Sequence, residues 1–117
     1  MGKVTEDEMR CNCCGLYNVN EGFLKKVNEA REISKTAYVI TSGCRCTKHN
    51  TAVGGHPKSM HLATELKECE ACDIAANTDR KRFDILSGLI KAGFTHIGIA
   101  KTFIHVDNSP KKAIWLY

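Results

Sequence analysis

The stretch SGCRCTKHNTAVGGHPKSMH, residues 42–61, is the most informative part of this 117-residue sequence. Two shorter stretches follow it, ACDI at residues 71–74 and FIHVDNSP at residues 103–110. Each contributes one polar residue: His61, Asp73 and His105. Two neutral imidazoles and one carboxylate are common ligands of a catalytic Zn²⁺, because three protein ligands leave a fourth position for water, whereas a structural zinc ion usually has four protein ligands. The pattern therefore predicts metal-activated hydrolysis.

Length and composition predict one compact domain over residues 1–117, which we expect to be a monomer. Apolar residues make up 43% and charged residues 26% of the chain, as in ordinary globular proteins. No stretch approaches the roughly 20 apolar residues that cross a bilayer, so we expect no membrane span. The net charge of +4 is modest, and no basic run alternates with aromatic residues. We therefore expect no nucleic-acid partner.

The amino-terminal segment MGKVTEDEMR lacks the apolar region of a signal peptide. We therefore expect the protein to be cytoplasmic on synthesis.

Helical periodicity predicts two main helices. One begins after Asn20 and the other after Thr78, since both side chains can cap a helix amino terminus, and the second ends at Gly93. The apolar residues expected on their buried faces are Phe23, Leu24, Val27, Ala30 and Ile33 in the first helix, and Phe83, Leu86, Leu89 and Ile90 in the second.

Short apolar segments between and after these helices predict strands. They cover residues 37–41, 59–62, 72–75, 94–100, 101–107 and 112–117. A short helical turn is expected over residues 49–53, ending at Gly54 and Gly55. The fold class is therefore α+β, with two main helices packed on a small, mostly antiparallel sheet.

The order of several short stretches makes the chain resemble a known family. The stretches SGCR, HN, VGG, S-x-H, A-x-DI and FIHVD occur in the order seen in zinc D-Ala-D-Ala carboxypeptidases and in related phage endolysins, which include L-Ala-D-Glu endopeptidases and share a fold with the hedgehog signalling domain. The resemblance extends from the Cys-rich start to the terminal WLY. It implies that His61, Asp73 and His105 hold zinc and that Arg45 binds substrate or stabilises charge.

The sequence departs from the family pattern at two places. The family has its aspartate within S-x-H-x-x-G-x-A-x-D, whereas Asp73 comes twelve residues after His61, so extra residues lie between Leu62 and Ala71. A longer surface loop costs little closure entropy, so both ligands can stay in place. Alternatively, the insert adds its own metal or disulfide clasp through Cys69 and Cys72.

The second departure concerns the general base. Many relatives have a glutamate three residues before the last zinc histidine, where this chain has Thr102. Asp107 lies two residues beyond His105 and so projects to the same face of a strand. It could orient His105, bind substrate or accept a proton from water. His96 is a further candidate for this role.

The seven cysteines form three groups: Cys11, Cys13 and Cys14; Cys44 and Cys46; and Cys69 and Cys72. The first group has the spacing C-x-C-C, which differs from the C-x₂₋₄-C pattern of zinc ribbons. This interpretation favours packed thiols or a disulfide clasp over a second metal site.

The resemblance implies a zinc peptidase that cuts stem peptides of bacterial peptidoglycan, either as a D-Ala-D-Ala carboxypeptidase or as an L-Ala-D-Glu-type endopeptidase. Without a signal peptide, its expected source is a phage or prophage, and it would act on the cell wall after release or as part of a virion. The alternative is a catalytically inactive zinc-containing module that binds the wall or a protein. A small nucleic-acid-binding protein is the third and least favoured class.

Overall fold

The computed structural model describes residues 3–56 and 58–117. Its five-stranded sheet has the order β1-β2-β4-β3-β5, in which every pairing is antiparallel except that of β3 with β5. The strands are β1 (Ile40–Ser42), β2 (Ala71–Ala75), β3 (His96–Ile99), β4 (Phe103–Asp107) and β5 (Ala113–Leu116), and the helices are α1 (Glu6–Met9), α2 (Glu21–Ser34), α3 (Thr47–Ala52) and α4 (Asp79–Lys91). The predicted α+β class with a mostly antiparallel sheet is confirmed.

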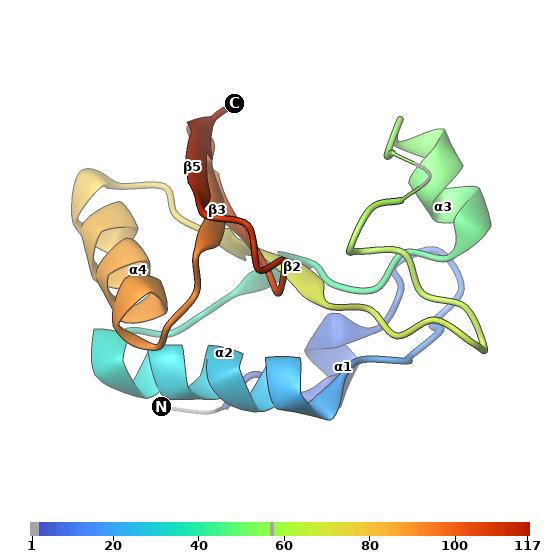
Figure 1. Cartoon of the computed structure of the whole chain (residues 1–117), viewed down its shortest axis with the longest axis horizontal. Helices are drawn as coiled ribbons and strands as arrows, with labels where there is room; N and C mark the ends of the chain where they lie inside the picture. Colours follow the sequence, from blue (N-terminus) through green and yellow to red (C-terminus); the bar gives the residue numbers. More distant parts are fainter. Residues whose placement is uncertain (1–2, 57) are drawn as a thin grey trace.

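The two main helices begin where the sequence predicts. Asn20 accepts a hydrogen bond from the backbone N–H of Phe23 at 2.9 Å, and Thr78 accepts one from Lys81 at 3.1 Å. Each cap satisfies an amide that would otherwise have no partner in the first turn. Helices α2 and α4 pack against each other on one side of the sheet, while α3 lies well apart from them (Figure 1).

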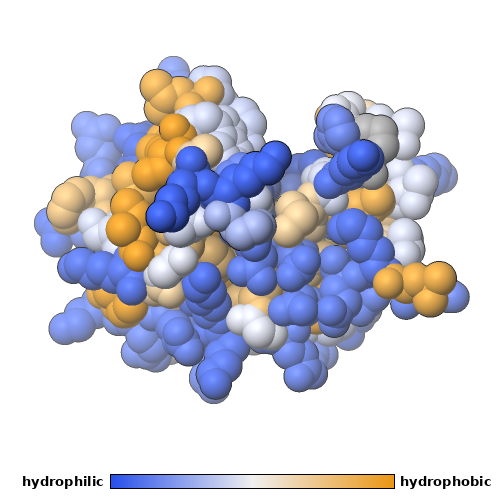
Figure 2. Space-filling model, in the orientation of Figure 1, coloured by the Kyte–Doolittle hydropathy of each residue, from blue (hydrophilic) through white to orange (hydrophobic). Residues whose placement is uncertain are grey.

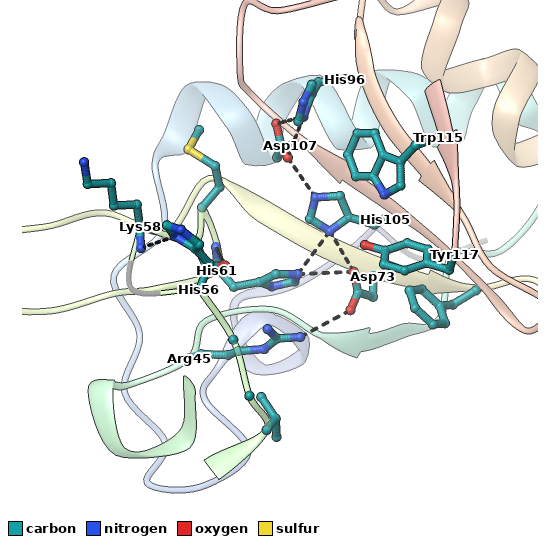
Figure 3. A pocket seen from close by; sticks show the side chains of 16 residues that line it. Arg45, His56, Lys58, His61, Asp73, His96, His105, Asp107, Trp115 and Tyr117 are labelled. Atoms are coloured by element: carbon teal, nitrogen blue, oxygen red, sulfur yellow. Dashed lines mark hydrogen bonds and ion pairs between the residues drawn. The ribbon is translucent and has the colours of Figure 1, made fainter. Parts of the chain in front are cut away.

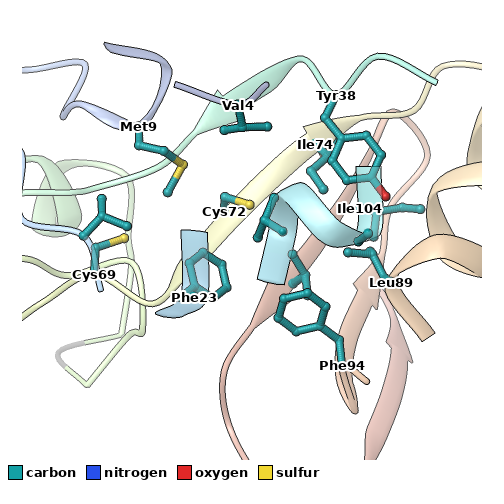
Figure 4. Packing of buried hydrophobic residues seen from close by; sticks show 14 of the residues in the cluster. Val4, Met9, Phe23, Tyr38, Cys69, Cys72, Ile74, Leu89, Phe94 and Ile104 are labelled. Carbon is teal, nitrogen blue, oxygen red and sulfur yellow. The ribbon is translucent and has the colours of Figure 1, made fainter. Parts of the chain in front are cut away.

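Side-chain alternation divides the sheet into an apolar face and a polar face. In β4, Ile104 and Val106 are fully buried in the core, while His105 and Asp107 point to the opposite face. Strand β2 repeats the pattern, since Ile74 joins the core and Asp73 does not. Figure 4 shows residues from the helices and from the sheet packed together in this core. The face away from α2 and α4 is therefore free to carry polar chemistry.

The buried face of α4 differs in part from the prediction. Leu89 is fully buried as predicted, but Phe83 and Ile90 are 68% and 49% exposed, and the helix buries Ile85 and Gly88 in their place. A Cβ at Gly88 would overlap Ser34 and the carbonyl of Ala30, so the missing side chain lets α4 approach α2 closely. Gly88 is the member of this buried face that a search for large apolar residues does not detect.

Two other local predictions are corrected, and one helix was not predicted. The amino-terminal segment contains this short helix, α1, which begins with a capping box between Thr5 and Glu8. The first strand lies at residues 40–42 instead of 37–41. Residues 59–62 form turns with a single bridge between Arg45 and Leu62, not a strand. Within the described residues, no helix is long and apolar enough to cross a membrane.

Candidate metal centre

Three donor atoms from separate parts of the chain converge on the polar face of the sheet. Asp73 in β2 and His105 in β4 are directly opposite in register, and Asp73 Oδ1 lies 3.0 Å from His105 Nδ1. His61 Nε2 lies 3.2 Å from each of these two atoms. His61 comes from the turn at 59–62, which is held beside the sheet by the hydrogen bond from Arg45 N–H to the His61 carbonyl at 2.8 Å.

This arrangement fits a tetrahedral zinc ion. Zinc–ligand bonds of 2.0–2.1 Å at tetrahedral angles separate two ligand atoms by about 3.3 Å. The observed separations of 3.0–3.2 Å need only a small expansion to reach that value. All three side chains are buried, so their orientations are fixed by surrounding protein. The donor set has three members, which leaves a fourth position for water or substrate.

Hydrogen bonds on the far side of each imidazole leave the converging nitrogen free to ligate. His61 Nδ1 lies 2.7 Å from the carbonyl of Gly43, which can only accept, so His61 carries its proton on Nδ1. His105 Nε2 lies 2.7 Å from Asp107 Oδ2 and donates to that carboxylate. Such bonds fix the tautomer and orientation of metal-binding histidines. The two lone pairs therefore point toward the position between the three donors.

The charges around His105 favour a cation at this position. Burial alone would lower the pKa of His105, but hydrogen bonds to Asp107 and Asp73 raise it to about 9. For Asp73, burial would raise the pKa, but the adjacent imidazoles of His105 and His61 hold the pKa well below its usual range. The carboxylates of Asp73 and Asp107 place negative charge around the His105 imidazole. This charge stabilises a proton bound to His105, and it would stabilise a metal ion at the same position.

Arg45 lies against the other oxygen of the same carboxylate. Its guanidinium Nη2 is 3.6 Å from Asp73 Oδ2, and its Nε donates to Ser42 Oγ at 3.3 Å. Asp73 thus presents Oδ1 to the two histidines and Oδ2 to the arginine. The Arg45 side chain is 18% exposed and lines the pocket. Its remaining N–H groups can therefore reach a bound anion or carbonyl.

Asp107 is enclosed by hydrogen-bond donors. Besides His105, it accepts from His96 Nδ1 at 2.9 Å and from the backbone N–H of Ser109 at 2.9 Å. The residue is only 4% exposed. Thr102, where relatives often have glutamate, is exposed and does not line the pocket. Among the described lining residues, the carboxylates are those of Asp73 and Asp107.

The donors lie at the base of a pocket of about 420 Å³. One wall is aromatic and comes from Trp115 and Tyr117, and the opposite wall is the segment that follows α3. Figure 2 shows the surface hollowed between β5 and α3, and Figure 3 shows the labelled side chains around the hollow. Gly98 makes room for this wall, because a Cβ there would overlap the indole of Trp115.

All five residues singled out from the sequence as ligands or catalytic groups line this one pocket: Arg45, His61, Asp73, His105 and Asp107. The insert before Asp73 leaves the ligands together, and Cys69 and Cys72 within and after it are buried free thiols outside any candidate metal group of the described residues. The contribution of Trp115 was not anticipated from sequence. The contact of His96 with Asp107 was also missed, although counting back across the β3–β4 hairpin pairs these two residues.

Comparison with known proteins agrees with this geometry. The family model described as Peptidase M15 matches residues 3–107, which covers most of the chain and includes every residue of the candidate metal centre. The chain therefore belongs to the Peptidase M15 family, whose members are zinc peptidases. No protein with a curated description matches the chain.

Proposed function

We propose that this protein is a zinc-dependent peptidase that hydrolyses peptide bonds in the stem peptides of bacterial peptidoglycan, with His61, Asp73 and His105 as the zinc ligands. One observation carries the proposal: three buried donor atoms lie within 3.2 Å of one another at the base of an open pocket. Family membership supports the peptidase activity. A phage or prophage source, with action on the wall after release, is part of the same proposal.

A zinc ion held by His61, Asp73 and His105 would supply Lewis acidity, which would polarise a scissile carbonyl and make water nucleophilic near neutral pH. The protein's own residues supply orientation and charge. His61 and His105 offer fixed lone pairs because Gly43 and Asp107 hold their opposite nitrogens. Arg45 contributes a positive charge beside the metal ligands, where it can bind a substrate carboxylate or stabilise negative charge that develops on the carbonyl oxygen.

Asp107 acts mainly by orienting His105. Its carboxylate already accepts hydrogen bonds from His105, His96 and the Ser109 amide. A general base needs a free lone pair within reach of the reacting water. This geometry favours a positioning role over proton abstraction by Asp107.

The bond that is cleaved defines two subclasses, a D-Ala-D-Ala carboxypeptidase and an L-Ala-D-Glu-type endopeptidase. Arg45 and Lys58 place positive charge along the pocket, which suits substrates that carry a carboxylate near the scissile bond. Both subclasses offer such a carboxylate. Mass spectrometry of digested peptidoglycan distinguishes them, since the first releases free D-Ala and the second releases the shortened stem peptide.

A second candidate function is a zinc-containing module that binds the wall or a protein without catalysis. The observation that favours it is the shortage of free carboxylates among the described lining residues of the pocket. The two functions differ in one measurement. A zinc-loaded peptidase releases soluble peptides from purified walls, whereas an inactive module cosediments with the walls and releases none.

A further inference from the structure

A second cluster of metal-binding side chains lies outside the pocket. The thiol sulfurs of Cys11, Cys14 and Cys46 lie within 4.8 Å of one another. The imidazole of His49 joins them, with Nδ1 3.6 Å from Cys11 Sγ. None of these four residues lines the pocket described above. Three thiols therefore converge, with an imidazole beside one of them, where the peptidase chemistry does not require them.

The sequence spacing of the cluster is that of two short metal-binding turns. The interpretation of the first cysteines as C-x-C-C overlooked that Cys11 and Cys14 are themselves separated by two residues. Cys46 and His49 have the same separation. C-x₂-C spacing is typical of structural zinc sites. Two such turns supply the four ligands that close a structural site.

The backbone around Cys11 is shaped for a thiolate. The turn after Cys14 passes through Gly15, whose φ of +77° is in the left-handed region, and the Gly15 N–H donates to the Cys11 carbonyl at 2.8 Å. The N–H of Cys46 points at Cys11 Sγ at 3.4 Å, and the N–H of His49 points at Cys46 Sγ at 3.4 Å. Amides aimed at sulfur stabilise its anionic form, which is the form that ligates metals.

The acidity of Cys11 agrees with this geometry. Burial would raise the pKa of the Cys11 thiol, but hydrogen bonds from the backbone N–H groups of Cys46, Cys14 and Cys13 lower it to about 6.

We propose that Cys11, Cys14, Cys46 and His49 bind a second, structural Zn²⁺. Thiolate and imidazole donors in a closed set of four match the preference of zinc for tetrahedral sulfur and nitrogen coordination. Zinc–sulfur bonds of 2.3 Å imply a separation of about 3.6 Å between a sulfur and a nitrogen ligand. The observed 3.6 Å between Cys11 Sγ and His49 Nδ1 meets that value.

This site joins the amino-terminal segment to the loop that carries Arg45. The same two segments are already in contact through the hydrogen bond from Cys44 N–H to the Met9 carbonyl at 2.8 Å. They approach so closely that a Cβ at Gly43 would overlap the backbone of Met9. Because Cys46 is adjacent to Arg45, a metal ion bound by Cys46 fixes the loop that carries Arg45.

Cysteine alkylation in the intact wild-type protein tests the site without relying on a variant that folds. Cys13 and Cys14 are both exposed, so without a metal they should react alike with iodoacetamide. In zinc-loaded protein we expect Cys14 to be protected and Cys13 to react, and addition of a chelator should abolish the difference. Tandem mass spectrometry locates the label. Equal labelling of Cys13 and Cys14 in the zinc-loaded protein would overturn the proposal.

Metal counting on variants separates this site from the peptidase centre. We expect two zinc ions per wild-type chain, one in Cys46→Ser or His49→Ala, and one in His61→Ala. Cys13→Ser is the matched control and should keep two zinc ions.

Replacement of zinc by Co²⁺ gives a second measurement. The thiolate-to-metal absorption band should persist in His61→Ala and vanish in Cys46→Ser. One zinc in the wild type and none in His61→Ala would rule out the second site. Loss of zinc in Cys13→Ser but not in His49→Ala would overturn the proposed ligand set. Neither result contradicts the proposed peptidase centre, because the zinc held through His61 is counted separately.

Discussion

Asp107 accepts a hydrogen bond from Nε2 of His105 at 2.7 Å, and this bond determines which nitrogen of His105 faces the other two donors. The two residues lie on one face of β4, two positions apart. Asp107 is itself held by His96 from the neighbouring strand. The orientation of one proposed zinc ligand therefore depends on a hydrogen-bonded chain that crosses two strands of the sheet.

Replacing Asp107 by Asn distinguishes a positioning role from a catalytic one. Because the carboxylate orients His105, we expect Asp107→Asn to bind zinc roughly 10- to 100-fold more weakly and to regain activity in excess zinc. Competition with a chromophoric chelator measures the affinity, and turnover is followed across zinc concentrations. Unchanged zinc affinity together with slow turnover at every zinc concentration would assign Asp107 to the chemical step instead.

The three proposed ligands should each be needed for metal binding. We expect His61→Ala, Asp73→Ala and His105→Ala each to lose one equivalent of zinc per chain, because two ligands cannot hold the ion tightly. His56→Ala is the control, since His56 lines the same pocket but lies outside the donor set. Elemental analysis of the purified variants makes the comparison. Full zinc content in all three ligand variants would refute the assignment.

Arg45 should matter for turnover and not for metal content. We expect Arg45→Ala to keep its zinc and its fold but to lose activity by about 100-fold, the typical effect of removing one electrostatic donor from an active site. Arg80→Ala is the matched control, because Arg80 is a largely exposed arginine on α4 that pairs with Asp84 and lies outside the described lining of the pocket. Near wild-type cleavage by Arg45→Ala would show that the guanidinium has no part in catalysis.

Tyr38 should make the fold sensitive to alkaline pH. Burial raises the pKa of Tyr38 to about 12, above its value near 10 in an unfolded chain. Between these values the unfolded chain releases a proton that the folded protein keeps, so the free energy of unfolding falls as pH rises. In Tyr38→Phe the free energy of unfolding should fall less over this pH range. At neutral pH the variant should be less stable by about 1 kcal/mol, because it loses the hydrogen bond between Tyr38 and Ser34.

Chemical denaturation of the wild type and Tyr38→Phe from pH 9 to pH 12 measures this difference. Parallel loss of stability in the two proteins would mean that Tyr38 does not titrate as its burial requires.

The parts of the fold that have local causes are predictable from the sequence. The starts of α2 and α4 follow from the capping side chains of Asn20 and Thr78, which act on amides three residues away. Alternation along residues 103–107 likewise placed His105 and Asp107 on one face. These features depend on neighbours in the chain, and a single sequence contains that information.

Features that depend on tertiary packing are not predictable from the sequence in the same way. Gly88 allows α4 to approach α2 closely and is buried between them, whereas Phe83 and Ile90 are exposed despite their size. Trp115 reaches the pocket because β5 pairs in parallel with β3, an arrangement that no local pattern indicates. The cysteine cluster joins residues 35 positions apart, as in the contact of Cys46 N–H with Cys11 Sγ. Its spacing was visible in the sequence, but its convergence required the fold.

The measurement that most directly tests the proposed function is digestion of purified peptidoglycan by zinc-loaded protein, with the released products identified by mass spectrometry and His105→Ala as the control. Walls of several stem-peptide types are included, because the pocket does not by itself specify one. We expect the wild type to release free D-Ala or shortened stem peptides and the His105→Ala protein to release neither. If fully zinc-loaded wild-type protein releases no product from any wall type, the proposed peptidase function is contradicted.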